Sequence, residues 1–237
     1  MFKTYLEQAA GEYGIHLSPL QLDQMTAYYG LLVEWNEKIN LTAITEPREV
    51  AVKHMIDSLS CYDENYFPQG CQVIDVGTGA GFPGVPLKIY RPDIQLTLID
   101  SLHKRLVFLR HLVTELSLDP VVTIHSRAEE GGRNKELREQ FDVVLSRAVA
   151  RLNVLCELCL PFVKKGGHFI ALKGAQQETE LVEAQKAIEI LGGTLVCVKP
   201  VRLPGFEEQR AVLYIRKDRH TPGTYPRKAG LPEKKPL

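Results

Sequence analysis

The residues best suited to chemistry gather around one glycine-rich loop. The stretch QVIDVGTGAGFPGVPLKI, residues 72–89, places Gly77, Gly79 and Gly81 directly after a short apolar run. Glycine lets the backbone adopt positive φ and lets a ligand approach closely. The segment from Gly79 to Gly84 also fits the dinucleotide pattern G-x-G-x-x-G, which alone does not distinguish ligands. The loop indicates a nucleoside site, with a tight turn that merely needs glycine as the alternative.

The carboxylate of Asp75, two residues before Gly77, bears on which nucleoside binds. A dinucleotide would bring an anionic pyrophosphate that this carboxylate repels. S-adenosylmethionine brings a sulfonium and an amino group, both cationic, so a nearby acid favours it. We therefore predict a methyl donor rather than a dinucleotide.

Further polar residues follow the next apolar runs. Asp100 ends the second run, about 20 residues past the loop, where an acid takes both ribose hydroxyls, and Ser101 follows it. This feature suits NAD equally well. After the third run, a polar turn through Arg127 is placed to border the adenine, and Arg147 follows the fourth run. Surface ion pairing is the alternative role for both arginines.

Apolar runs separated by helical patterns would position these residues. Near-continuous apolar strands joined by helices are typical of a mostly parallel sheet buried on both faces. Only a loop separates the last two runs, which predicts an antiparallel closing strand. We expect seven strands in a doubly wound α/β domain, at Val73–Val76, Leu96–Ile99, Val121–Ile124, Val143–Leu145, Phe169–Leu172, Leu195–Val198 and Val212–Ile215.

The segment before the glycine loop is expected to be helical. Ser18, Pro19 and Gln21 form the signature of a capped helix start, and a second helix is expected from Glu46 to Leu59. We predict an N-terminal helical cap at 1–66, a Rossmann-like domain at 67–217 and a basic, flexible tail at 218–237. The tail is either a solubilising segment or an arm that seeks phosphates.

Composition excludes several classes of protein. The 29 Lys and Arg balance the 29 Asp and Glu, which argues against coating nucleic acid through the overall field but leaves a local RNA-binding patch open. Five scattered cysteines indicate a reducing cytosol, and no apolar segment is long enough for a bilayer. Cys156 and Cys159 form a C-x-x-C in an apolar helical stretch, which favours buried thiols over a metal site. We expect a cytoplasmic protein without metal.

With these residues assembled, the chain resembles the RsmG (GidB) family, bacterial class I methyltransferases that modify guanine N7 in 16S ribosomal RNA. The resemblance covers nearly the whole length, and its N-terminal helical motif is the specific part. It rests on LVEWNEKINLTAI (32–44), HMIDSL (54–59), VIDVGTGAGFPGVPLKI (73–89), LIDSLHKRLVFL (98–109), SRAEE (126–130), SRAVARL (146–152) and ALKG (171–174).

The resemblance implies contacts with S-adenosylmethionine at Gly77, Phe82, Ala128, Glu129 and Arg147. It also implies that the substrate is 16S ribosomal RNA within the small ribosomal subunit or its precursor. The base and its N7 atom come from the resemblance alone. Guanine N7 carries a free lone pair, so no general base is expected.

Taken together, the predicted sites are as follows. Arg147 and Lys173 are positioning candidates, and no residue is assigned to a chemical step. The predicted cofactor contacts are Asp75, Gly77, Gly79, Gly81, Phe82, Asp100, Ser101, Ala128, Glu129 and Arg147. The RNA contacts are predicted at Lys53, His54, Arg151, Lys173, Arg210, Arg227 and Lys228. We expect a monomer.

Three other functions stay open from the sequence. The first is a class I methyltransferase acting on a small molecule or protein, which would need an enclosed apolar lid over the pocket. The second is a non-catalytic RNA-binding module that kept the fold but lost the donor. The third is a nicotinamide-dependent dehydrogenase, although the sequence offers no catalytic pair for one.

Overall fold

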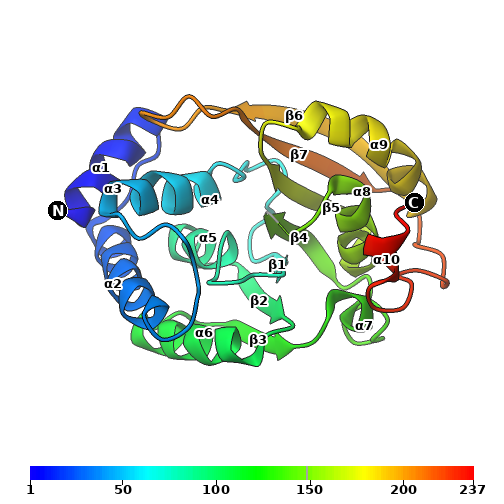
Figure 1. The fold of residues 1–237 in the computed structure, drawn as a ribbon, viewed down its shortest axis with the longest axis horizontal. Helices are drawn as coiled ribbons and strands as arrows, with labels where there is room; N and C mark the ends of the chain where they lie inside the picture. The colour runs from blue at the N-terminus through cyan, green and yellow to red at the C-terminus, as the bar shows by residue number, and fades with distance from the viewer. Residues whose placement is uncertain (148) are drawn as a thin grey trace.

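A seven-stranded sheet forms the centre of the molecule in the computed structural model, which describes residues 1–147 and 149–237 (Figure 1). Ala148, inside the SRAVARL motif, lies outside the described residues. The strands follow the order β3-β2-β1-β4-β5-β7-β6. Their bounds are β1 Gln72–Val76, β2 Gln95–Asp100, β3 Val121–His125, β4 Phe141–Arg147, β5 Val163–Lys173, β6 Gly193–Val201 and β7 Arg210–Lys217.

The directions of the strands confirm the predicted α/β class. Strands β3, β2, β1, β4 and β5 are parallel, whereas β7 pairs antiparallel with both β5 and β6. Strand β1 lies between β2 and β4, where the order of winding reverses. Ligands of open α/β sheets bind beyond the carboxyl ends of the strands at this reversal. The glycine loop leaves β1 at that point.

Helices cover both faces of the sheet, so its apolar strands are buried (Figure 1). The N-terminal helices, with α5 and α6, cover one face, and α7, α8 and α9 cover the other. The helices are α1 Phe2–Tyr13, α2 Pro19–Asn36, α3 Pro47–Glu49, the π-helix η1 Val50–Ile56, α4 Asp57–Leu59, α5 Gly84–Tyr90, α6 His103–Glu115, α7 Ala128–Gly131, α8 Leu152–Cys159, the 3₁₀-helix η2 Leu160–Phe162, α9 Gln177–Ile190 and α10 Leu231–Lys234.

The predicted N-terminal helices are present. The Ser18 hydroxyl accepts from the backbone N–H of Gln21, and the Gln21 side chain accepts from the N–H of Ser18 at 2.8 Å. The second expected helix is the continuous run α3–η1–α4. Buried side chains of these helices, such as Met25, belong to the same core as Leu98 of the sheet. The segment 1–66 is therefore a layer of one folded unit.

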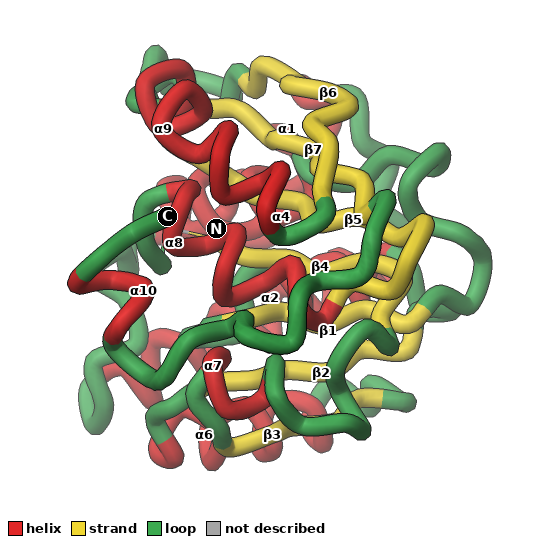
Figure 2. Tube along the Cα trace, turned by 90° about the vertical axis from the view of Figure 1, so that its right-hand side faces the viewer, coloured by secondary structure: helices red, strands yellow, loops and turns green. Residues whose placement is uncertain are grey.

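The segment 218–237 differs from the flexible tail that we expected. Its chain folds back against α7 and α8 and ends in the short helix α10 (Figures 1 and 2). The Arg227 guanidinium pairs with the buried carboxylate of Glu157 at 2.6 Å. The N–H of Gly230 donates to Glu129 at 2.8 Å. Its basic side chains and prolines suggested a flexible segment. The buried carboxylates of Glu157 and Glu129 bind it instead, and Tyr225 and Leu237 pack against the core.

Candidate functional site

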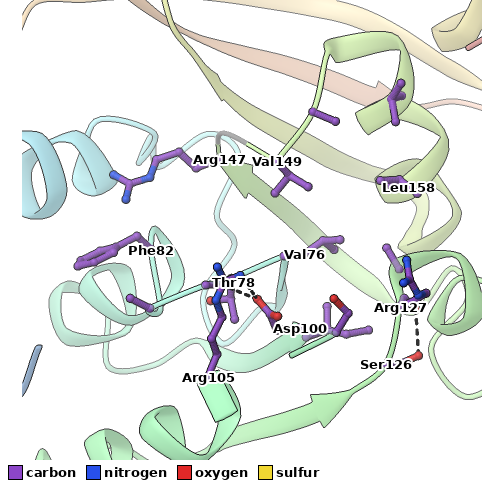
Figure 3. Close-up of a pocket in the computed structure, with 18 of the residues that line it drawn as sticks. Val76, Thr78, Phe82, Asp100, Arg105, Ser126, Arg127, Arg147, Val149 and Leu158 are labelled. Carbon is purple, nitrogen blue, oxygen red and sulfur yellow. Dashed lines mark hydrogen bonds and ion pairs between the residues drawn. The ribbon is translucent and has the colours of Figure 1, made fainter. Parts of the chain in front are cut away.

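A cavity of about 480 Å³ lies beyond the carboxyl ends of β1, β2, β3 and β4 (Figure 3). Residues from the glycine loop, both polar turns and the end of β4 line it together. The predicted cofactor residues that line it are Gly77, Gly79, Phe82, Asp100, Ser101, Ala128, Glu129 and Arg147. Asp75 and Gly81 are not among its lining residues.

Backbone conformation explains two of the loop glycines. Gly79 has φ of +61°, and a Cβ added there would meet nothing within 4 Å, so its backbone stands open to the cavity. Gly81 has φ of +103°, and a Cβ there would lie 2.8 Å from the Tyr28 hydroxyl. That hydroxyl donates to the carbonyl of Ala80 at 2.6 Å. The loop is thus left bare on its ligand side and supported from behind by α2.

Asp75 supports the loop from inside the protein. Its side chain is fully buried, and its Oδ2 accepts from the Thr78 hydroxyl at 2.7 Å and from the N–H of Gly84 at 3.0 Å. Burial raises the pKa of Asp75 to about 6, against those two hydrogen bonds. The sequence suggested that this carboxylate contacts the positive charges of the donor directly. In the structure it points into the turn and does not line the cavity.

Asp100 lies at the cavity wall as predicted. Its carboxylate accepts from the N–H of Gly79 at 2.9 Å and from the N–H of Leu102 at 2.8 Å, and Arg105 approaches it at 3.4 Å (Figure 3). One side chain therefore connects the glycine loop to the start of α6. A carboxylate with about four lone-pair sites retains capacity for ribose hydroxyls beside these contacts.

The polar turn after β3 contributes another wall of the cavity. Ala128 and Glu129 begin α7 and line the cavity. The C-terminal segment adds Pro232 and Glu233 to the same wall, and the sequence analysis missed this contribution. The apolar residues Leu231 and Pro232 next to Gly230 were the available signal, because a solvated tail rarely needs them.

Three side chains form the wall nearest the N-terminal helices. The ring of His54 lies 4.6 Å from that of Phe82, and the Arg147 guanidinium lies 5.0 Å from Phe82. Burial, and then the positive charge of Arg147, lowers the pKa of His54 to about 3. The imidazole is consequently neutral near pH 7, and Thr42 lies 2.8 Å from its Nε2.

A second cavity of about 650 Å³ adjoins the first, because His54 and Arg147 line both. Cationic side chains gather in it. Its wall includes the predicted RNA-binding residues Lys53, His54, Lys173 and Arg210. Each of the three cations already has a carboxylate partner: Lys53 has Glu49 and Glu208, Lys173 has Glu180, and Arg210 has Glu208 and Asp57.

The other predicted RNA-binding residues lie elsewhere. Arg151 is exposed and pairs with Glu183 on α9, outside both cavities. Arg227 faces the buried Glu157, so its guanidinium is unavailable to a phosphate. Lys228 is exposed beside it. The structure thus brings four of the seven predicted RNA-binding residues together.

Asp57 is a buried residue of this region that the sequence analysis missed. It is 3% exposed, and its carboxylate contacts Arg147 at 2.9 Å and Arg210 at 3.4 Å. The available signal was its spacing of three from His54 in the HMIDSL motif, which places both side chains on one helix face.

Several other expectations concern absences. Within residues 1–147 and 149–237, no group of three or more His, Cys, Asp or Glu is arranged to hold a metal ion. The thiols of Cys156 and Cys159 are buried, and desolvation raises the pKa of each above its usual range. Among the helices of the described chain, none has the length and apolar character needed to cross a bilayer.

Sequence comparisons connect the whole chain to a known family. The family model described as rRNA small subunit methyltransferase G (GidB) matches residues 21–211. A ribosomal RNA small subunit methyltransferase G from Desulforamulus reducens is 52% identical over 98% of this chain and 97% of its own. The corresponding protein from Macrococcus caseolyticus is 54% identical over 95% and 94% of the two chains.

Comparison with solved structures shows the fold. The crystal structure of M. jannaschii TYW2 in complex with AdoMet has a TM-score of 0.54 and 15% identity, covering 69% of this chain and 76% of that one. The 16S rRNA (adenine(1408)-N(1))-methyltransferase from Catenulisporales acidiphilia has a TM-score of 0.53 and 15% identity, covering 70% and 91%. Both similarities concern the fold alone, and this seven-stranded α/β fold is that of class I methyltransferases.

Proposed function

The chain belongs to the family described as rRNA small subunit methyltransferase G, and from that membership we propose that it methylates N7 of a guanine in 16S ribosomal RNA. Family membership makes it a methyltransferase of small-subunit ribosomal RNA. The observation that carries the finer proposal is the pair of adjoining cavities that share His54 and Arg147. One is suited to a nucleoside donor, and the other is lined with cations.

S-adenosylmethionine is the methyl donor that the first cavity takes. The bare backbone at Gly79 gives room for close approach, and Asp100 offers a carboxylate for the ribose hydroxyls. Ala128 and Glu129 border the region suited to the adenine, and Phe82 presents an aromatic face. When bound, the donor supplies an electrophilic methyl group on a positively charged sulfur.

The protein's own contribution is positioning. Guanine N7 is a lone-pair acceptor, so the side chains need not remove a proton before transfer. A neutral His54 is consistent with this, since a pKa of about 3 makes its imidazole too weak a base to remove a proton near pH 7. Holding two reactants in line can supply roughly 7–11 kcal/mol of the barrier. Arg147 is held by Asp57 at 2.9 Å, and it orients the donor or the acceptor base at the junction of the cavities.

The second cavity supports an RNA acceptor over a small molecule. Single-stranded or looped RNA is bound through splayed bases and through cations that hold phosphates. Lys53, Lys173 and Arg210 line the cavity. The carboxylate of Glu208 is 53% exposed, so phosphate oxygens can replace it as the partner of Lys53 and Arg210. We place the protein in the cytoplasm, as a monomer, acting on the small subunit or its precursor.

Incubation of the protein with methyl-labelled donor and small subunits from cells that lack the protein tests the proposal. The expected result is label in 7-methylguanosine after digestion of the 16S RNA, and loss of that label with Arg147→Ala. Label in protein, in a small molecule or in another nucleoside would overturn the proposal. Light scattering on the purified protein alone checks that it is a monomer.

A further inference from the structure

We propose that Asp57 selects guanine at the acceptor site by accepting hydrogen bonds from the N1–H and the 2-amino group of the base. The inference rests on the proposed function, since it concerns the acceptor of the same reaction. The second cavity would then bind a guanine base, and the buried carboxylate of Asp57 would determine which base is accepted.

Asp57 lies where the N-terminal helical run lines the second cavity. It begins α4 directly after the π-helical turn η1, a rare conformation that is frequent at functional sites. The residue lines the second cavity, and its Oδ2 contacts the Arg147 guanidinium at 2.9 Å. Arg147 also lines the first cavity, and Figure 3 shows it extending from the end of β4 toward the N-terminal helical layer. The carboxylate therefore lies at the junction where acceptor and donor must meet.

The other carboxylates of this cavity are less suited. Three line it among the described residues: Asp57, Glu180 and Glu208. The partners of Glu180 are Lys173 at 2.6 Å and the N–H of Leu152 at 2.8 Å, whereas Asp57 contacts Arg147, the arginine that lines both cavities. Glu208 is 53% exposed at the rim, where water competes for its hydrogen bonds. Asp57 alone of the three is 3% exposed and faces arginines on both oxygens.

The Asp57 carboxylate can accept further hydrogen bonds beside its contacts with the two arginines. An ionised carboxylate has about four lone-pair sites. Arg210 approaches Oδ1 at 3.4 Å, a long contact, and the buried Nε of Arg210 finds no hydrogen-bond partner among the described residues. We therefore expect a base to use the remaining lone pairs of Asp57 while the 2.9 Å contact to Arg147 stays in place. The arginines fix the orientation of the acceptor oxygens before the base arrives.

The edges of a guanine base differ in their hydrogen-bonding groups. Guanine presents two donors, N1–H and the 2-amino group, on one edge, and two acceptors, O6 and N7, on another. A carboxylate accepts only, so it pairs with the donor edge and leaves the N7 lone pair free. Arg147 carries only hydrogen-bond donors, so one of its N–H groups is suited to the O6 oxygen while N7 stays free. Adenine offers an acceptor at N1 and lacks the 2-amino group, so it cannot donate to the carboxylate, and its N1 lone pair would face the carboxylate oxygens.

Inosine tests this inference without altering the protein, because it lacks only the 2-amino group. Small subunits are reconstituted from RNA that carries guanosine or inosine at the methylated position, and kcat/KM is measured for each. We expect wild-type protein to prefer guanosine by at least about tenfold, the cost of leaving a charged acceptor short of one hydrogen bond. Equal rates on the two RNAs would overturn the inference while leaving the proposed function intact.

Variants then assign the preference to a residue. Asp57→Asn should reduce the guanosine-to-inosine ratio to within about threefold of one, because its amide donates where the carboxylate accepts. Asp57→Glu should retain a preference, and Glu208→Gln, which removes a charge from the same cavity, should leave the ratio unchanged. An Asp57→Asn protein that binds donor normally and keeps the wild-type ratio would contradict the assignment. Wild-type protein that methylates no guanine N7 would overturn the proposed function and this inference together.

Discussion

Asp75 and Asp100 hold the glycine loop from two sides, and single substitutions separate their roles. Asp75 contacts Thr78 and Gly84 from inside the turn. Asn at this position keeps an oxygen for the Gly84 N–H, so Asp75→Asn should change the donor Kd by less than about threefold. Asp75→Ala removes the acceptor and leaves buried donors unpaired, which costs roughly 1–3 kcal/mol each. Calorimetric donor titration measures both, and a tenfold loss with Asn would mean that the charge itself acts on the donor.

The pH dependence of stability gives a second reading of Asp75. Its pKa is about 6 in the folded state and 3.8 ordinarily. Between these values the folded protein binds more protons than the unfolded one, so the contribution of this group to stability falls as pH rises from about 4 to about 6. Asp75→Asn should remove that contribution. The free energy of unfolding of the variant should therefore rise relative to that of the wild type as pH increases from about 4 to about 6. Parallel pH profiles from chemical denaturation would contradict the raised pKa.

Asp100 is the residue whose loss should weaken donor binding most directly. Its carboxylate accepts from Gly79 and Leu102 and lines the cavity. Asp100→Ala should raise the donor Kd by roughly 10- to 100-fold, as expected when hydrogen bonds to a charged group are lost. Asp142→Ala is the matched control, because Asp142 also accepts a backbone N–H, that of Gln72, but does so at the opposite end of the sheet. Similar donor affinities for the two variants would refute the role of Asp100.

At the scale of elements, the C-terminal segment changes from a presumed arm to part of the wall. Glu157 is 1% exposed and depends on Arg227 for its charge partner. Removing one partner of a buried ion pair costs about 3–5 kcal/mol, so Arg227→Ala should lower the free energy of unfolding by that amount. Arg216→Ala breaks an exposed pair with Asp218 and should cost at most about 1 kcal/mol. Equal decreases in the free energy of unfolding for the two variants would show that the Arg227–Glu157 pair does not fix the C-terminal segment to the domain.

The elements show which parts of the site a sequence can predict. The capping pair Ser18 and Gln21, the strands and the glycine loop follow from local patterns, and all lie where predicted. Asp57 and Tyr28 were not predicted as site residues, because their roles depend on contacts with distant segments. Lys173 ends β5, one residue past the predicted strand Phe169–Leu172, but its partner Glu180 lies on the following helix. Local patterns cannot predict such partners, since tertiary packing chooses them.

At the scale of the whole molecule, the N-terminal helices and the sheet share one hydrophobic core. Side chains of α1 and α2, such as Leu6 and Leu32, are fully buried in it. We therefore expect one cooperative thermal transition, with equal calorimetric and van't Hoff enthalpies. Two separate transitions, or a folded fragment starting at residue 67, would contradict this description.

The most direct test of the central claim is the state of 16S RNA in cells with and without the protein. Chemical cleavage at 7-methylguanine maps the modified position in each RNA. We expect one cleavage site that is present with the protein, absent without it, restored by the wild-type chain and not restored by Arg147→Ala. Identical cleavage patterns in the two RNAs would contradict the claim that this site methylates guanine N7.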